Sequence, residues 1–214
     1  MDREAYFDGW SVLHGGHDPR ENPLVRGWLT AAYAVARPFA RARVPPDLVT
    51  LGGLLAAAAA PALAAGGDGW WLAGAAAVVV LSGLLDSLDG AVALLSGRTT
   101  RWGHVLDSVA DRASDTLFVA ALWLAGAPGV LCAAGGTLMF LQEYARARAG
   151  AGGMTEVGVV TVWERPTRVI VTSAFLASTA RLGDPWATLG AAAWVGLGTV
   201  GLVQLLLVVR RRLA

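Results

Sequence analysis

The sequence contains no lysine, so all 17 of its Lys and Arg residues are arginine. Its one cysteine, Cys132, excludes an intrachain disulfide and a cysteine-based zinc site. Charged residues make up only 15% of the chain and hydrophobic residues 55%, which is too apolar a balance for an ordinary soluble domain. The net charge of +1 gives no reason to expect nucleic-acid binding. The composition therefore predicts an integral membrane protein.

The N-terminal segment, residues 1–20, lacks a basic stretch followed by an apolar one, so a cleaved signal peptide is not expected. It is polar and has no clear period, which predicts a cytoplasmic lead-in of low order. His14 and His17 invite a metal interpretation, but no further ligand lies nearby. In residues 22–43, apolar residues alternate with arginines and with Trp28 and Tyr33. This pattern favours an amphipathic helix on the membrane surface, with a soluble helix packed on the domain as the alternative.

Six later stretches are long and apolar enough to cross a hydrocarbon core of about 30 Å at about 1.5 Å per residue. They cover residues 48–67, 70–95, 104–125, 130–149, 161–180 and 186–209. Arginines gather at one set of ends and at residues 210–212, whereas the opposite turns carry only Arg181, so the arginine-rich side is expected to be cytoplasmic. Tryptophans near the predicted ends, Trp163 among them, would form interfacial belts.

The predicted fold is therefore all-α and membrane-integral, with six transmembrane helices preceded by an amphipathic interfacial helix. Two parts are expected: residues 1–43 as lead-in and juxtamembrane helix, and residues 44–214 as the transmembrane domain.

Four aspartates interrupt this apolar chain in two pairs, Asp86 with Asp89 and Asp107 with Asp111. Their spacings of three and four residues put each pair on one face of a helix. A charge at mid-membrane costs about 3 kcal/mol on insertion scales, so a bound cation is the simplest compensation. Hard oxygen ligands suit Mg²⁺, Mn²⁺ or Ca²⁺. Because one divalent ion does not need four carboxylates, the set predicts two metals, or one metal site and a general base.

The turn between the two pairs is suited to a phosphate group. Gly90, Ala93 and Gly97 keep the second predicted span small on the side where a phosphate would approach the metals. Arg98 and Arg101 are placed to meet the phosphate charge. Together these residues predict transfer of a phosphorus group from a metal-bound diphosphate.

The full pattern is Asp86-x2-Asp89-Gly90-x2-Ala93-x9-Gly103-x3-Asp107-x3-Asp111. It resembles the motif of the CDP-alcohol phosphotransferase family, D-x2-D-G-x2-A-R-x8-G-x3-D-x3-D, at seven of its eight fixed positions. The stretches PPDLVT at 45–50, EYARARA at 143–149 and WERPTR at 163–168 look like those of actinobacterial phosphatidylinositol phosphate synthases. The likeness covers most of the chain from about residue 44 onward.

The resemblance implies a six-helix enzyme of phospholipid biosynthesis, usually a homodimer, in the plasma membrane with its active site facing the cytoplasm. It would transfer the phosphatidyl group of CDP-diacylglycerol to a polar alcohol and release CMP, with Mg²⁺ or Mn²⁺ and two ions as the expectation. The implied metal ligands are Asp86, Asp89, Asp107 and Asp111, and Asp111 is also the candidate catalytic base. The implied residues of the CDP pocket are Gly90, Ala93 and Gly103, beside Arg98 and Arg101.

Arginines near the ends of the fourth and fifth predicted spans suggest a phosphate-bearing acceptor. They are Arg146, Arg148, Arg165 and Arg168. The alternative is that they are ordinary positive-inside charges. Inositol phosphate is the expected acceptor, but glycerol phosphate or phosphatidylglycerol would also fit, giving a phosphatidylglycerophosphate synthase or a cardiolipin synthase. Nearby, Asp115 is expected to pair with Arg112 or another arginine and to support the site without binding the metal.

Three positions depart from the family pattern. Leu94 stands where the family has arginine, which removes a cation expected near the donor diphosphate. Gly150 and Thr167 replace family glutamates, which weakens the assignment to inositol phosphate. An ion-coupled transporter is the main rival of another class, although transporters usually place charges near mid-membrane between broken helices. A non-catalytic scaffold is the third hypothesis, with Leu94 as its only support.

Overall fold

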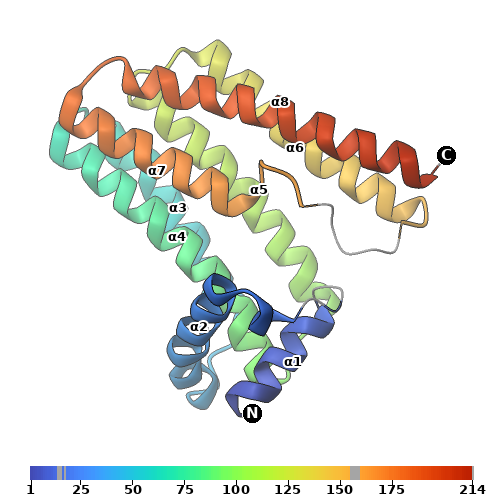
Figure 1. Ribbon diagram of the computed structural model, residues 1–214. Coiled ribbons are helices and arrows are strands. Elements are labelled where there is room, and N and C mark those ends of the chain that lie inside the picture. Colours follow the sequence, from blue (N-terminus) through green and yellow to red (C-terminus); the bar gives the residue numbers. More distant parts are fainter. Residues whose placement is uncertain (14–15, 17, 155–159, 214) are drawn as a thin grey trace. The chain divides into compact units, whose positions relative to one another are not determined.

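The computed structural model describes residues 1–13, 16, 18–154 and 160–213, and all regular structure within these residues is helical (Figure 1). His14, His17 and residues 155–159 lie outside the described residues. The elements are α1 (Arg3–Leu13), the short 3-10 helix η1 (Pro19–Glu21), α2 (Pro23–Arg41), α3 (Pro46–Ala64), α4 (Gly69–Ser96), α5 (Arg101–Leu124), α6 (Gly129–Ala151), α7 (Arg165–Leu182) and α8 (Trp186–Leu213). The all-α expectation is confirmed for this part of the chain.

Three helices among the described residues, α3, α4 and α8, are long and apolar enough to cross a membrane. Helices α5, α6 and α7 carry charged side chains, which lower their hydropathy. Helix α2 covers nearly all of the stretch expected to form an amphipathic helix, with Leu29 and Ala36 buried and Trp28 and Val35 exposed. The count of six spans and the interfacial position of α2 stay predictions.

The chain divides into two compact units. Unit 1 comprises Met1–Gly53 and Leu84–Ala110, and unit 2 comprises Leu54–Gly83 and Asp111–Ala214. Each unit has its own apolar core. Tyr6, Phe7, Leu29 and Leu88 belong to the core of unit 1.

The N-terminal segment of unit 1 is ordered around Arg20. The Arg20 guanidinium lies 3.1 Å from Glu4 Oε2 and 2.8 Å from Asp8 Oδ1, and its Cζ lies 5.6 Å from the centre of the Phe7 ring. Both Phe7 and Tyr6 are only 2% exposed, and burial raises the pKa of the Tyr6 phenol to about 12. The expectation of low order is therefore wrong for the described residues of this segment, because two aromatic side chains and an ion-pair cluster attach α1 to the unit.

Unit 2 is a helical layer in which α8 packs against α6 and α7 (Figure 1). Small residues allow close approach: a Cβ at Gly135 of α6 would lie 2.9 Å from the Cβ of Trp194 on α8. The Trp163 side chain is fully buried and meets Trp194 edge-on, with ring centres 5.0 Å apart. Trp163 is therefore a core residue, and its expected place in an interfacial belt is wrong.

Candidate active site

Two of the four motif aspartates meet inside unit 1. Asp86 of α4 and Asp107 of α5 each offer a carboxylate oxygen, and these oxygens lie within 4.8 Å of each other. Two ligands of one divalent cation, each at most about 2.6 Å from the ion, are at most about 5.2 Å apart. The pair therefore fits a hard divalent cation without rearrangement of the helices.

The third aspartate of unit 1 is held by a threonine. Asp89 is 6% exposed, and the Thr50 hydroxyl of α3 donates a hydrogen bond of 2.5 Å to its Oδ2. A hydroxyl that donates to a carboxylate fixes the orientation in which that carboxylate can bind a metal. Thr50 is the last residue of the PPDLVT stretch, and no role was expected for it from the sequence.

All the residues expected to bind the donor line one cavity of unit 1, with a volume of about 680 Å³. They are Gly90, Ala93, Arg98, Arg101 and Gly103, and they are joined there by Asp47, Thr50, Asp89, His104 and Asp107. The turn between α4 and α5 depends on Gly97, whose φ of 64° lies in the left-handed region that favours glycine after a helix end. The turn thus brings both arginines to the cavity that the aspartates line, although their roles stay predictions. Asp47 and His104 are lining residues that the sequence reasoning did not include.

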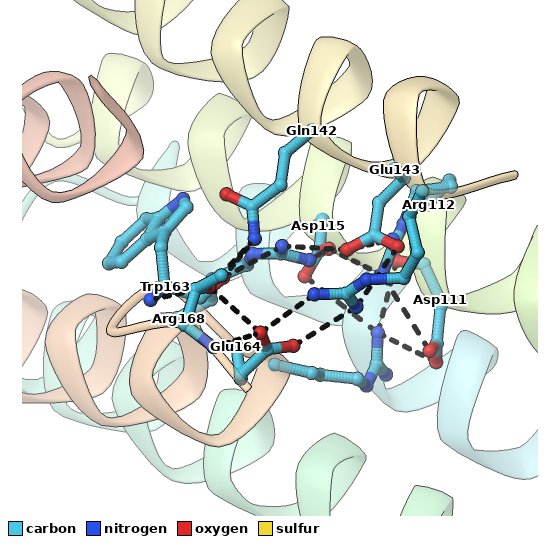
Figure 2. A network of polar contacts seen from close by, with 11 residues as sticks. Asp111, Arg112, Asp115, Gln142, Glu143, Trp163, Glu164 and Arg168 are labelled. Carbon is cyan, nitrogen blue, oxygen red and sulfur yellow. Dashed lines mark hydrogen bonds and ion pairs between the residues drawn. The ribbon is translucent and has the colours of Figure 1, made fainter. Parts of the chain in front are cut away.

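In unit 2 the fourth aspartate belongs to a network of charged side chains (Figure 2). Four guanidinium groups and four carboxylates take part: Arg112, Arg146, Arg165 and Arg168 with Asp111, Asp115, Glu143 and Glu164. The formal charges of the eight groups cancel, which offsets part of the cost of removing them from water. The network joins α5, α6 and α7.

Arg168 and Asp115 form the buried centre of this network. Both side chains are fully buried, and Arg168 Nη1 lies 2.8 Å from Asp115 Oδ2. Arg168 Nη2 also lies 2.9 Å from Glu143 Oε1 and donates to the carbonyl of Trp163. Arg112 lies 3.1 Å from Asp115 and 3.0 Å from Glu143. Asp115 thus pairs with Arg112 and with Arg168, and its supporting role stays a prediction.

Asp111 lies at the edge of the network, one helical turn beyond Asp107 on α5. Arg165 Nη1 lies 2.9 Å from Asp111 Oδ1 and donates to the Asp111 carbonyl at 3.0 Å. One guanidinium of α7 thus holds both the side chain and the backbone of this aspartate.

The expected acceptor arginines separate into two groups. Arg146, Arg165 and Arg168 share the network, and Arg146 makes a two-pronged pair with Glu164, at 2.7 Å and 3.1 Å. Arg148 is exposed and lies about 200° around α6 from Arg146, because successive residues are about 100° apart. No role was expected for Glu143 or Glu164, the single glutamates of the EYARARA and WERPTR stretches.

The apolar helices and the paired aspartates define a metal-dependent membrane enzyme. The model of the CDP-alcohol phosphatidyltransferase family matches residues 43–209, so the chain belongs to this family. It is a membrane protein and a transferase that uses a divalent metal.

Relatives and solved structures agree with this assignment. The chain is 37% identical to the phosphatidylinositol phosphate synthase of Mycolicibacterium smegmatis, over 80% of this chain and 79% of that protein. It is 40% identical to the archaetidylinositol phosphate synthase of Aeropyrum pernix, but over only 45% of this chain and half of that protein. The crystal structure of Mycobacterium tuberculosis phosphatidylinositol phosphate synthase with manganese and citrate has a TM-score of 0.71 at 29% identity, covering 84% of this chain and 88% of that one. The same enzyme with CDP-DAG bound has a TM-score of 0.70, covering 83% and 92%.

Proposed function

We propose that the protein transfers the phosphatidyl group of CDP-diacylglycerol to inositol phosphate and releases CMP. The observation that carries the proposal is the pairing of the Asp86 and Asp107 carboxylates beside a cavity lined by every expected donor residue. The relatives named phosphatidylinositol phosphate synthase support the choice of acceptor, and the solved structure of the Mycobacterium tuberculosis enzyme with CDP-DAG bound supports the choice of donor.

Asp86, Asp89, Asp107 and Asp111 are the proposed ligands of Mg²⁺ or Mn²⁺, with two ions as the proposed number. Bound there, the metal would neutralise charge that develops on the diphosphate and on the departing CMP. Arg98 and Arg101 pair with the diphosphate oxygens, and glycine or alanine at the cavity wall allows the donor to approach the helix backbone.

Asp111 is the proposed general base. It accepts the proton of the acceptor hydroxyl as the hydroxyl oxygen bonds to the phosphorus of the phosphatidyl group, and the bond from that phosphorus to the CMP oxygen breaks. The Arg165 contacts keep the Asp111 carboxylate in a fixed orientation.

The proposed site for the acceptor phosphate is the arginine group of unit 2. Arg146 and Arg165 are 29% and 12% exposed in their side chains, so both reach solvent, whereas Arg168 is fully buried and holds the others in place. A phosphate would take over the Arg146 donors that Glu164 now occupies, while Arg165 keeps its contacts with Asp111. Arg148, exposed on α6, would contribute longer-range attraction.

The proposed setting is the plasma membrane, with six spans, surrounding lipids and the active site facing the cytoplasm. A homodimer is proposed from the family resemblance.

The test is release of CMP from CDP-diacylglycerol by purified protein, with each acceptor supplied separately: inositol phosphate, glycerol phosphate, inositol and phosphatidylglycerol. We expect release only with inositol phosphate and with Mg²⁺ or Mn²⁺, and its loss after chelation. Asp111→Asn should lower the rate by about 10²–10⁴-fold, the usual worth of a general base. Asp68→Asn, in the turn before α4, is the matched control and should keep the activity. Release with another acceptor alone would replace the proposed product, and metal-independent release would overturn the proposed chemistry.

A further inference from the structure

A second cavity of unit 1, with a volume of about 900 Å³, shares part of its lining with the donor cavity. Asp89, Gly90, His104 and Asp107 line both. The two cavities therefore meet at two of the proposed metal ligands, Asp89 and Asp107. A donor with different groups on the two sides of its diphosphate can extend into both.

The walls of the two cavities differ in chemistry. The first has Arg98 and Arg101, which are proposed to pair with the diphosphate, and Thr99 and Thr100, whose hydroxyls can pair with the polar edges of a nucleotide. The second has Tyr6 and Trp10 of α1 and Trp28 of α2, and its described lining includes no arginine. Trp28 is 48% exposed. Indole rings with one side apolar and one side wet are typical of surfaces that meet the ester region of a lipid.

Leu94 links the second cavity to α1. Its side chain lines the cavity and packs in the core of unit 1. A Cβ added at Gly9 of α1 would lie 2.9 Å from Leu94 Cδ1, so α1 passes close over the end of the Leu94 side chain. Leu94 is also the one position at which this chain departs from its family's motif. The residue that departs from the motif is therefore the residue against which α1 packs.

Helix α1 lies outside the part of the chain that matches the family model, residues 43–209. It is nevertheless fixed to unit 1 by the Arg20 contacts with Glu4 and Asp8 and by the burial of Tyr6 and Phe7. Because these contacts fix α1, they also fix the shape of the cavity that Tyr6 and Trp10 line.

We propose that α1 is the lipid-side wall of the donor site, with Trp10 as a specificity-determining residue and Leu94 as the residue against which the helix packs. The glycerol-ester part of CDP-diacylglycerol occupies the cavity between α1, α2, α4 and α5, while its nucleotide occupies the cavity with Arg98 and Arg101. The leucine at position 94 is then explained by its packing against α1, and not by the loss of an arginine that binds the diphosphate. The inference rests on the proposed function, because it names where that donor binds.

The first test separates the two ends of the donor by measuring Kd for CDP-dioleoylglycerol and for CDP alone in the presence of Mn²⁺. Trp10→Ala should weaken the lipid donor about tenfold, which corresponds to about 1.4 kcal/mol, and leave CDP within about twofold. Val12→Ala is the matched control on α1, since Val12 is 80% exposed. Equal weakening of both ligands, or no change in either, would overturn the assignment of this cavity to the lipid.

The second test restores arginine at position 94. Leu94→Arg places a long charged side chain beneath Gly9, so we expect faster hydrogen exchange in Arg3–Leu13 and weaker binding of the lipid donor. Leu94→Met, of similar volume and without charge, should leave hydrogen exchange in Arg3–Leu13 unchanged. Unchanged exchange in α6 and α8 would show that the fold survives. Tighter donor binding or faster turnover by Leu94→Arg would overturn the proposal, because it would show that the site simply lacks its cation.

The two tests distinguish the inference from the function on which it rests. Wild-type protein that binds neither donor nor CDP overturns the proposed function and this assignment together. Wild-type binding with an insensitive Trp10→Ala variant overturns the assignment alone.

Discussion

At the scale of single residues, the hydrogen bond from Thr50 to Asp89 joins the first apolar helix to the motif. Both side chains are buried, so Asp89 has few other donors with which to replace the bond. The bond therefore orients the Asp89 carboxylate before a cation arrives.

Thr50→Val should weaken Mn²⁺ binding about 10–100-fold, the usual effect of losing a supporting partner of a metal ligand. Thr50→Ser keeps the hydroxyl and should stay close to the wild-type value. The measurement is Mn²⁺ titration followed by electron paramagnetic resonance, which needs no turnover. Equal affinity in wild type and Thr50→Val would show that the bond does not prepare the site.

The motif residues could be assigned from the sequence because their spacing alone fixes them on helix faces and in one turn. Gly90, Ala93 and Gly103 line a single cavity for that reason. The partners of Arg146 and Arg168 could not be assigned, because Glu164 and Asp115 are distant in sequence and meet them only through the packing of α5, α6 and α7. A spacing rule shows which residues share a helix, but it does not pair helices.

At the scale of helices, the buried pair of Arg168 and Asp115 connects α7 to α5, and Glu143 adds α6. Removing one partner of a buried ion pair leaves an uncompensated charge, which costs about 3–5 kcal/mol. Exposed charges on the same helices carry no such penalty.

Arg168→Met should therefore lower the melting temperature of the protein in detergent by about 10 °C, given the penalty of a broken buried pair and the size of the chain. Arg181→Met, on the exposed last turn of α7, should shift it by less than about 2 °C. Thermal unfolding followed by circular dichroism compares the two variants. Equal melting temperatures would mean that the network does not stabilise the helix packing.

Helix positions followed from the sequence where the pattern was long and continuous. The stretch expected at 70–95 is α4 (Gly69–Ser96), and the stretch expected at 22–43 contains α2 (Pro23–Arg41). The fifth span was expected from residue 161, but α7 begins at Arg165, because Glu164 turns toward Arg146 and Thr161 donates to it. Helix α1 was missed because Arg20, Phe7 and Tyr6 order it through contacts that a polar, aperiodic segment does not reveal.

At the scale of the whole molecule, the arrangement of charge defines the proposed topology. The arginines of residues 210–212 end α8, and those of residues 98–101 follow α4, whereas the turn between α7 and α8 carries Asp184. If all six later helices cross the membrane, the positive-inside rule places both arginine groups in the cytoplasm and Asp184 outside. Soluble acceptors would then reach the aspartates proposed to bind metal near the end of α4 from the cytoplasm, and CMP would leave to the same side.

Single cysteines in a Cys132→Ala background test this topology. A membrane-impermeant maleimide added to intact cells should label Asp184→Cys, but it should label Asp2→Cys and Arg212→Cys only after permeabilisation. Cys132 is buried, so its replacement removes background without exposing a new charge. An odd number of crossings between Asp2 and Arg212 would place these two positions on opposite sides. Labelling of one of them in intact cells would therefore contradict six spans, whatever the outcome of the activity assays.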